Sequence, residues 1–244
     1  MHATMRSLIV VAGLIAPGLA MGEAARSESK ADKALEIIQT VSMTYPHELK
    51  QVHIDEGEVS VMVWVDDTGR LLDWLLVGYT HPVFAKEVLE VLPKWKFKPA
   101  HWQGQPINTR TELQFSFKNS ETIRVISADL GMSVRLKGLT PGKKPAKRIY
   151  DAEELDEPLD AVVEIAPRPP ERLGAVAREG SVVVEYLVDA NGQVRMPLII
   201  SSDDPASTNS VLLSITEWRY AVPRHIGQPV ITRVRQKFTF APAS

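Results

Sequence analysis

The sequence predicts an α+β protein made of two tandem small domains, each a three-stranded antiparallel sheet packed against one helix. The first observation is that the chain aligns with itself, without a gap, at a constant offset of 123 residues. The recurring residues include Gly57 as Gly180, Gly69 as Gly192, Pro82 as Pro205, and Trp95 as Trp218. The second is that both copies carry the same order of patterns: strand, strand, helix, strand. A repeat of this length must fold around its own core, as a domain and not as one unit of a solenoid.

Each copy opens with a predicted β-hairpin. Apolar residues alternate with other residues in 58–65, the period of a half-buried strand. Asp66 to Gly69 then has turn composition, and 71–79 returns as a second strand. The second copy repeats this in 181–188, 189–192 and 194–200. We expect Asp66, Asp67 and Asp189 to be turn residues and not metal or acid/base groups.

A helix and a last strand complete each copy. Thr80 and Asp203 precede proline by two residues, which is typical of a capped helix start. Apolar residues then recur at helical spacing. Trp95 and Trp218 follow the helices, where we expect them in the core. After a Gly-Gln-Pro turn, the last strands are predicted at 108–117 and 231–240.

The segments outside the repeats set the domain boundaries. An apolar run after His2 and Arg6 predicts a secretory signal peptide at 1–20. We expect a flexible segment at 21–33, the first domain at 34–118, a linker with a basic stretch at 119–149, and the second domain at 150–241. The alternative for the apolar run is a short retained membrane anchor.

Composition excludes several function classes. The net charge of -2 argues against a nucleic-acid-binding surface, and the absence of cysteine excludes disulfides. The histidines have no zinc spacing, and no nucleophile elbow or glycine-rich phosphate loop is present. We therefore expect no enzyme activity, no metal, no cofactor and no small-molecule substrate.

An ordered set of motifs in the first copy resembles the C-terminal domain of TonB energy transducers. The pattern covers most of both repeats, although the second copy is diverged. It comprises Tyr45-Pro46, the alternating valines from Gly57 to Val65, Asp66 to Arg70, His81-Pro82, Lys94 to Ala100, and Gly104-Gln105-Pro106.

The resemblance implies a non-catalytic periplasmic protein that adds an extended segment of an outer-membrane transport protein to its sheet as a strand. A small open sheet leaves unpaired N–H and C=O groups on an outer strand, which suits this role. The last strand of each copy is the candidate edge. The candidate partner-binding residues are Gln51, Asn108, Arg110, Glu112, Leu113, Gln114, Phe115, Ile231, Arg233, Arg235 and Gln236.

Two other functions stay open from the sequence. With the N-terminal segment retained, the chain would be an inner-membrane-anchored energy transducer facing the periplasm. Alternatively, it would be a structural envelope protein that forms a homodimer through its edge strands. The expected partner is therefore a protein in all three cases, and a membrane only if the N-terminal segment is kept.

Overall fold

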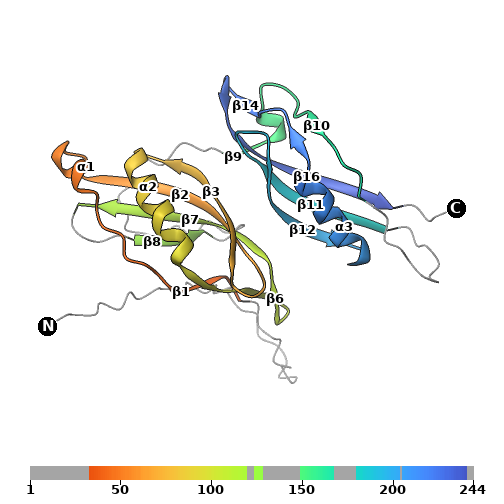
Figure 1. The fold of residues 1–244 in the computed structure, drawn as a ribbon, viewed down its shortest axis with the longest axis horizontal. Coiled ribbons are helices and arrows are strands. Elements are labelled where there is room, and N and C mark those ends of the chain that lie inside the picture. The colour runs from red at the N-terminus through yellow and green to blue at the C-terminus, as the bar shows by residue number, and fades with distance from the viewer. Residues whose placement is uncertain (1–32, 120–123, 129–148, 168–179, 204, 241–244) are drawn as a thin grey trace, which may run out of the picture.

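The computed structural model describes residues 33–119, 124–128, 149–167, 180–203 and 205–240. The predicted signal peptide and the basic stretch of the linker lie outside these residues. Within them, the α+β fold with two repeated, mainly antiparallel sheets is confirmed (Figure 1).

The first copy is built on a sheet of order β3-β2-β7-β8. Its strands are β2 (Glu56–Val65), β3 (Leu71–Tyr79), β7 (Thr109–Lys118) and β8 (Arg124–Ala128). Helix α2 (Pro82–Val91) covers one face, and a 3-10 turn at Leu92–Lys94 follows it. The rest of this copy comprises β1 (Glu36–Gln39), α1 (His47–Gln51), β4 (Lys96–Lys98), β5 (Ala100–Trp102) and β6 (Gln105–Ile107).

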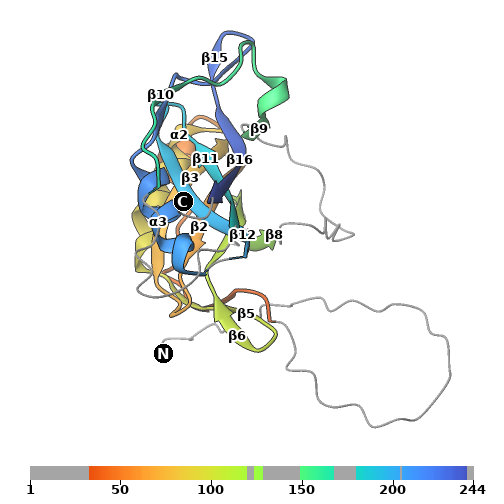
Figure 2. The same cartoon turned by 90° about the vertical axis from the view of Figure 1, so that its right-hand side faces the viewer.

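The second copy repeats this plan with a sheet of order β12-β11-β16-β9. Its strands are β9 (Ile149–Asp151), β11 (Gly180–Val188), β12 (Val194–Ser202) and β16 (Ile231–Phe240). Helix α3 (Pro205–Thr216) covers one face, and in Figure 2 both helices lie on the left of the strands. The smaller elements are a 3-10 turn at Ala152–Glu154, β10 (Ala161–Val163), β13 (Arg219–Tyr220), β14 (Arg224–His225) and β15 (Gln228–Pro229).

Each sheet has a fourth, outer strand beyond the three that the sequence predicts. β8 pairs antiparallel with β7, and β9 pairs parallel with β16. Strand β8 lies within the predicted linker, and β9 lies at the boundary between that linker and the predicted second domain. The last strands of the repeats are therefore not the outermost strands along their whole length.

The start of α2 differs in detail from the prediction. The Nδ1 atom of His81 accepts a hydrogen bond from the Val83 N–H at 3.3 Å, so His81 caps the helix. Thr80, which we expected to cap it, instead accepts the Glu58 N–H with its hydroxyl oxygen at 2.9 Å. The helix still begins at Pro82, because proline suits the first turn.

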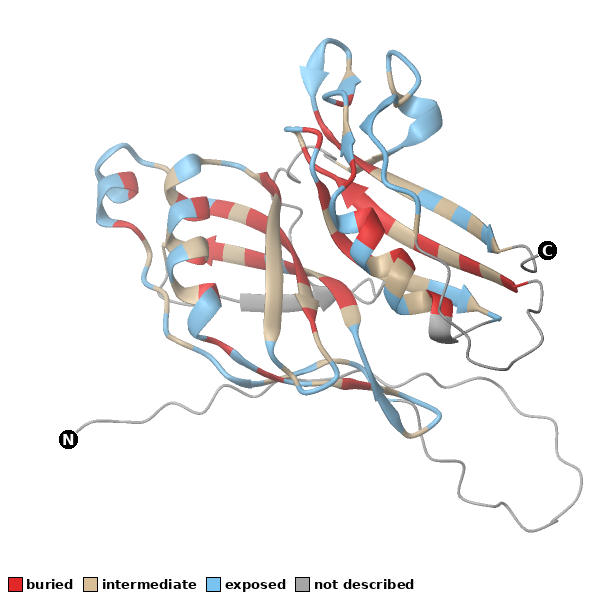
Figure 3. Ribbon diagram, turned by 45° about the vertical axis from the view of Figure 1, so that its right-hand side comes forward, coloured by how far each residue is buried: buried red, intermediate tan, exposed pale blue. Residues whose placement is uncertain are grey.

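Each copy has its own core between sheet and helix, as the burial colours of Figure 3 show. Trp95 and Trp218 are 4 % and 3 % exposed, which confirms their expected core position. Alternate residues of β2 and β11 point to the opposite faces of their sheets. Met62 and Leu187, on those opposite faces, belong to a third buried cluster that contains residues of both copies.

Candidate functional site

The backbone direction of the last strands decides which of their residues could bind an added strand. In an antiparallel sheet, successive residues direct their N–H and C=O groups to alternate sides. The Asp203 N–H donates to the Ser181 carbonyl at 2.9 Å, so Ser181 faces β12 and Val182 faces β16. The register pairs Val182 with Phe238. The outward backbone groups of β16 in this part are therefore those of Arg235, Lys237 and Thr239.

The same alternation in the first copy divides its predicted site residues into two sets. Leu113 and Phe115 exchange backbone bonds with β2, and their side chains are 0 % and 1 % exposed in the core. They are therefore closed to an added strand, contrary to our expectation. Glu112 and Gln114 face outward, but the pairing partners of their backbone are Ala128 and Ile126 of β8. Strand β8 thus covers the edge of β7 that we expected to be open.

The remaining predicted residues of the first copy lie away from an open edge. Gln51 is exposed at the end of α1, which precedes β2. The Asn108 side-chain oxygen accepts the Asp67 N–H at 3.0 Å, which ties the β2–β3 turn to the start of β7. Arg110 is 2 % exposed and donates to Glu185 of the second copy, so it is buried between the copies and does not face a partner.

The second copy leaves most of its last strand uncovered. Strand β9 pairs only with the segment from Ile231 to Arg233. Among the residues that the structure describes, no strand pairs with the outer side of 234–240. We call residues 234–240 the β16 edge. Ile231 is buried in the cluster shared by the two copies, and the Gln236 backbone faces β11, so neither contributes to this edge.

Positive charge gathers around a single carboxylate beside the β16 edge. Glu185 of β11 accepts hydrogen bonds from Arg110 and, at 2.9 Å, from Arg235, and Arg233 lies 4.0 Å from it. Burial lowers the pKa of Arg110, and the charge of Arg233 lowers it further, while Glu185 raises it. One carboxylate therefore faces three guanidinium groups.

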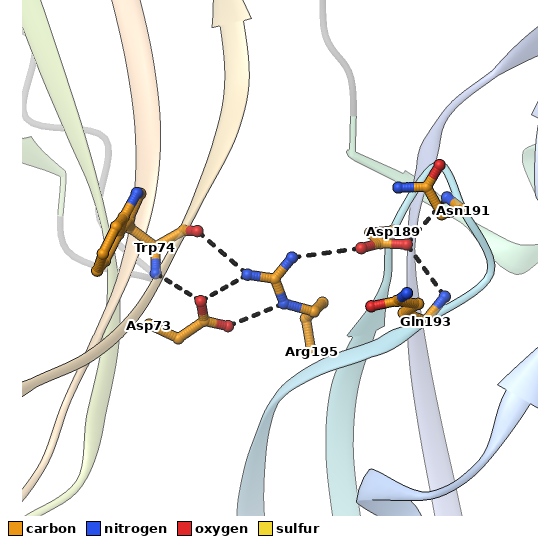
Figure 4. Close-up of polar contacts among 6 residues, drawn as sticks. All are labelled: Asp73, Trp74, Asp189, Asn191, Gln193 and Arg195. Atoms are coloured by element: carbon orange, nitrogen blue, oxygen red, sulfur yellow. Dashed lines mark hydrogen bonds and ion pairs between the residues drawn. The ribbon is translucent and has the colours of Figure 1, made fainter. Parts of the chain in front are cut away.

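The outer strands on the opposite side of each sheet are β3 and β12, and they lie at the contact between the copies. There, arginine side chains donate hydrogen bonds to one backbone carbonyl of each strand. Arg195 of β12 donates to both carboxylate oxygens of Asp73, at 2.9 and 2.5 Å, and to the Trp74 carbonyl at 3.3 Å (Figure 4). The hydrogen bond to Asp73 raises the pKa of Arg195. In the reverse direction, Arg110 donates to the Met196 carbonyl at 3.2 Å. Strands β3 and β12 are thus capped by side chains at these positions.

The acidic turn residues have structural partners. Asp66 accepts the N–H groups of Thr68 and Arg70, and these hydrogen bonds lower its pKa against the opposing effect of burial. Asp189 accepts the N–H groups of Asn191 and Gln193 in the same way. Within the described ranges, no group of three or more His, Asp or Glu side chains could hold a metal ion.

Comparison with known proteins assigns both copies to one family. The model of the C-terminal domain of the Gram-negative bacterial TonB protein matches residues 41–119 and 166–242, which is more than half of the chain. The chain belongs to this family. TonB C-terminal domains are non-enzymatic protein-interaction domains of the Gram-negative envelope, so a TonB-related protein-interaction role follows.

One similar solved structure is the solution NMR structure of the Pseudomonas aeruginosa TonB C-terminal domain. It is 22 % identical in sequence, covers 40 % of this chain and 94 % of its own, and has a TM-score of 0.31. No curated protein matches the sequence. Among the described residues of this TonB-family chain, no helix has the length and apolar character that a membrane crossing needs.

Proposed function

We propose that this TonB-family protein is a periplasmic interaction protein, accessory to TonB-dependent transport. It binds an extended segment of an envelope or outer-membrane transport protein by strand addition. The binding site is the β16 edge of the second copy. The single observation that carries this proposal is that β9 pairs with β16 only as far as Arg233.

Strand addition needs a row of backbone groups that no neighbouring strand uses. An extended peptide satisfies such groups with its own N–H and C=O groups and so gains affinity from its main chain. On β16 these groups belong to Arg235, Lys237 and Thr239. The side chains of Arg235, Lys237 and Thr239 are also exposed, so an approaching strand meets no covering side chain in the described part.

The second copy is favoured over the first because of what lies on each last strand. In the first copy, β8 pairs along five consecutive positions of β7, from Glu112 to Ser116. A partner strand would have to displace it. The first copy retains the motifs of the family more completely than the second. These motifs, however, do not determine whether another strand covers the edge of β7.

A proline at one outward position tests the proposal. Thr239→Pro removes an outward N–H while the ladder with β11 keeps its bonds, because the Thr239 backbone faces away from β11. Labelled peptides from the periplasmic segments of outer-membrane transporters of the same cell serve as probes. We expect Thr239→Pro to weaken binding at least tenfold and Thr239→Ala, which keeps the donor, to leave it within about twofold.

Amide shifts locate the binding in the same experiment. Peptide addition should shift the amides of 234–240, protect the outward amides of Arg235, Lys237 and Thr239 from hydrogen exchange, and leave the amides of Glu112 and Gln114 unchanged. Perturbations confined to β7 and β8, or equal affinity of the Thr239→Pro variant, would contradict the proposal.

A second candidate function uses the same edge. Two β16 edges could pair with each other and give a structural homodimer of the envelope. Sedimentation separates the two functions: a dimer that Thr239→Pro converts to a monomer, without any peptide binding by the wild type, supports the structural function. The intact mass of the protein from its native envelope tests the signal peptide and the alternative of a retained anchor.

A further inference from the structure

We propose that the segment added at the β16 edge is acidic, with carboxylates two residues apart that face Arg235 and Lys237. This inference rests on the proposed function and adds the chemistry of the partner. The acidic character of the added segment follows from the side chains of β16, whereas strand addition itself follows from the backbone of β16.

The side chains of β16 alternate between two different environments. Val234, Phe238 and Phe240 pack against the core of the second copy, on the side of α3. The side chains of Arg235 and Lys237 alternate with them and so lie on the opposite face, where both are exposed. Two cations two residues apart therefore border the open part of the edge.

The charges beside this edge are not balanced within the described residues. Arg110, Arg233 and Arg235 all lie within 4.0 Å of Glu185, and Arg233 also lies 4.0 Å from Asp151, so two carboxylates face three guanidinium groups. The buried Nε atoms of Arg110 and Arg233 have no hydrogen-bond partner there. Lys237 adds a further positive charge along the strand. An anionic partner would reduce this excess of positive charge, and a cationic partner would increase it.

Strand β9 is an example of a strand that already pairs with β16. It places Asp151 in register with Arg233, and their side chains approach to 4.0 Å. Opposite charges in neighbouring strands stabilise a pair, so β9 contributes a carboxylate to the basic strand. A strand that continues along the β16 edge meets the next two cations of the same row.

The basic row is particular to the second copy. Arg235 and Lys237 correspond to Glu112 and Gln114 at the offset of 123 residues. The shared fold of the two copies therefore does not require cations at these positions. They occur on the last strand whose edge is open, and they are missing from the last strand that β8 covers.

Three seven-residue peptides test the inference. In each, threonine alternates with one other residue: glutamate, its neutral isostere glutamine, or lysine. At low ionic strength we expect the glutamate peptide to bind about tenfold more tightly than the glutamine peptide, and the lysine peptide to bind most weakly. The preference should decrease with added salt.

Variants of the chain identify the cations that are responsible. Lys237→Glu should lower the affinity for the glutamate peptide about fivefold and leave that for the glutamine peptide almost unchanged. Arg235→Gln should act in the same direction. Lys94→Glu makes the same charge change at an exposed lysine of the first copy and should have no effect.

The possible outcomes separate the two proposals. Equal affinities for the glutamate and glutamine peptides, both lost in Thr239→Pro, overturn the acidic partner and keep strand addition. Tight binding of the glutamate peptide that Thr239→Pro does not affect overturns strand addition at this edge. If none of the three peptides binds, both proposals fail.

Discussion

At the scale of single residues, the glycines that recur between the copies do not all have the same role. Gly192 and Gly227 have nearly the same backbone conformation, with φ of 77° and 72°. Their surroundings differ, however. A Cβ atom on Gly192 would lie 2.0 Å from the Tyr220 carbonyl oxygen, whereas one on Gly227 would have nothing within 4 Å. Gly192 is therefore required for packing as well as for the turn.

This pair of glycines gives a matched prediction. Gly227→Ala should cost about 1 kcal/mol, because alanine is strained at positive φ. Gly192→Ala should cost several kcal/mol, about 3 or more, because the turn must also move away from the strand after α3. Urea unfolding of the two variants measures the difference. Equal losses would mean that the turn moves freely and that only the backbone angle matters.

At the scale of elements, the β14–β15 hairpin is held by a side chain from a distant segment. Asp156 accepts the Ile226 and Gly227 N–H groups at 2.7 and 2.8 Å. Ile226 has a φ of 51°, which is unfavourable for a branched side chain. The carboxylate thus stabilises a turn that the local sequence would not favour.

The same contact predicts a pH dependence of the hairpin. The hydrogen bonds from Gly227 and Ile226 lower the pKa of Asp156. A lowered pKa in the folded state means that the contact is fully present above the ordinary value of 3.8 and is lost as the pH falls through the folded pKa. Amide shifts of Ile226 and Gly227 should move in this acid range.

An asparagine substitution checks the origin of that effect. Asp156→Asn should abolish the acid shift of both amides and increase their hydrogen exchange at neutral pH. Asp160→Asn, a nearby exposed carboxylate, is the control and should leave both amides as in the wild type. An acid shift that persists in Asp156→Asn would assign the titration to another group.

At the scale of the whole molecule, ion pairs and an apolar cluster join the two copies into one unit. Arg110 pairs with Glu185, and Arg195 pairs with Asp73, around the shared cluster that contains Met62. The side chains of Arg110 and Glu185 are 1 % and 12 % exposed, so their pair is shielded from water. We therefore expect wild-type protein to unfold in one cooperative transition.

Removal of the central carboxylate should uncouple the copies. Glu185→Gln leaves Arg110 buried without its counter-charge, which should cost about 3 kcal/mol. Calorimetry should then show two transitions, one for each copy. Glu90→Gln, which removes an exposed pair with Lys86, should cost less than about 0.5 kcal/mol. A single transition in Glu185→Gln would mean that the apolar cluster alone couples the copies.

The repeat, the hairpins and the helices could be predicted because they depend on local patterns. The alternation in 58–65 and the proline at position 82 each act over a few residues. Because the chain repeats at an offset of 123 residues, each pattern occurs in both copies and supports the same prediction twice. The helix cap is a small exception, since His81 and not Thr80 supplies the acceptor. Both side chains are suitable acceptors, and only the approach of Glu58 decides between them.

The candidate site was predicted less well because it depends on contacts between distant segments. The sequence determined the two-domain α+β plan, the core positions of Trp95 and Trp218, and the last strands as candidate edges. Only the tertiary structure decided that β8 covers the edge of β7 and that β9 pairs with β16 only as far as Arg233. It also decided that Arg110 is buried between the copies. Hydrophobic periodicity records which face of an element is buried, but it does not record which neighbour uses the backbone groups of a strand.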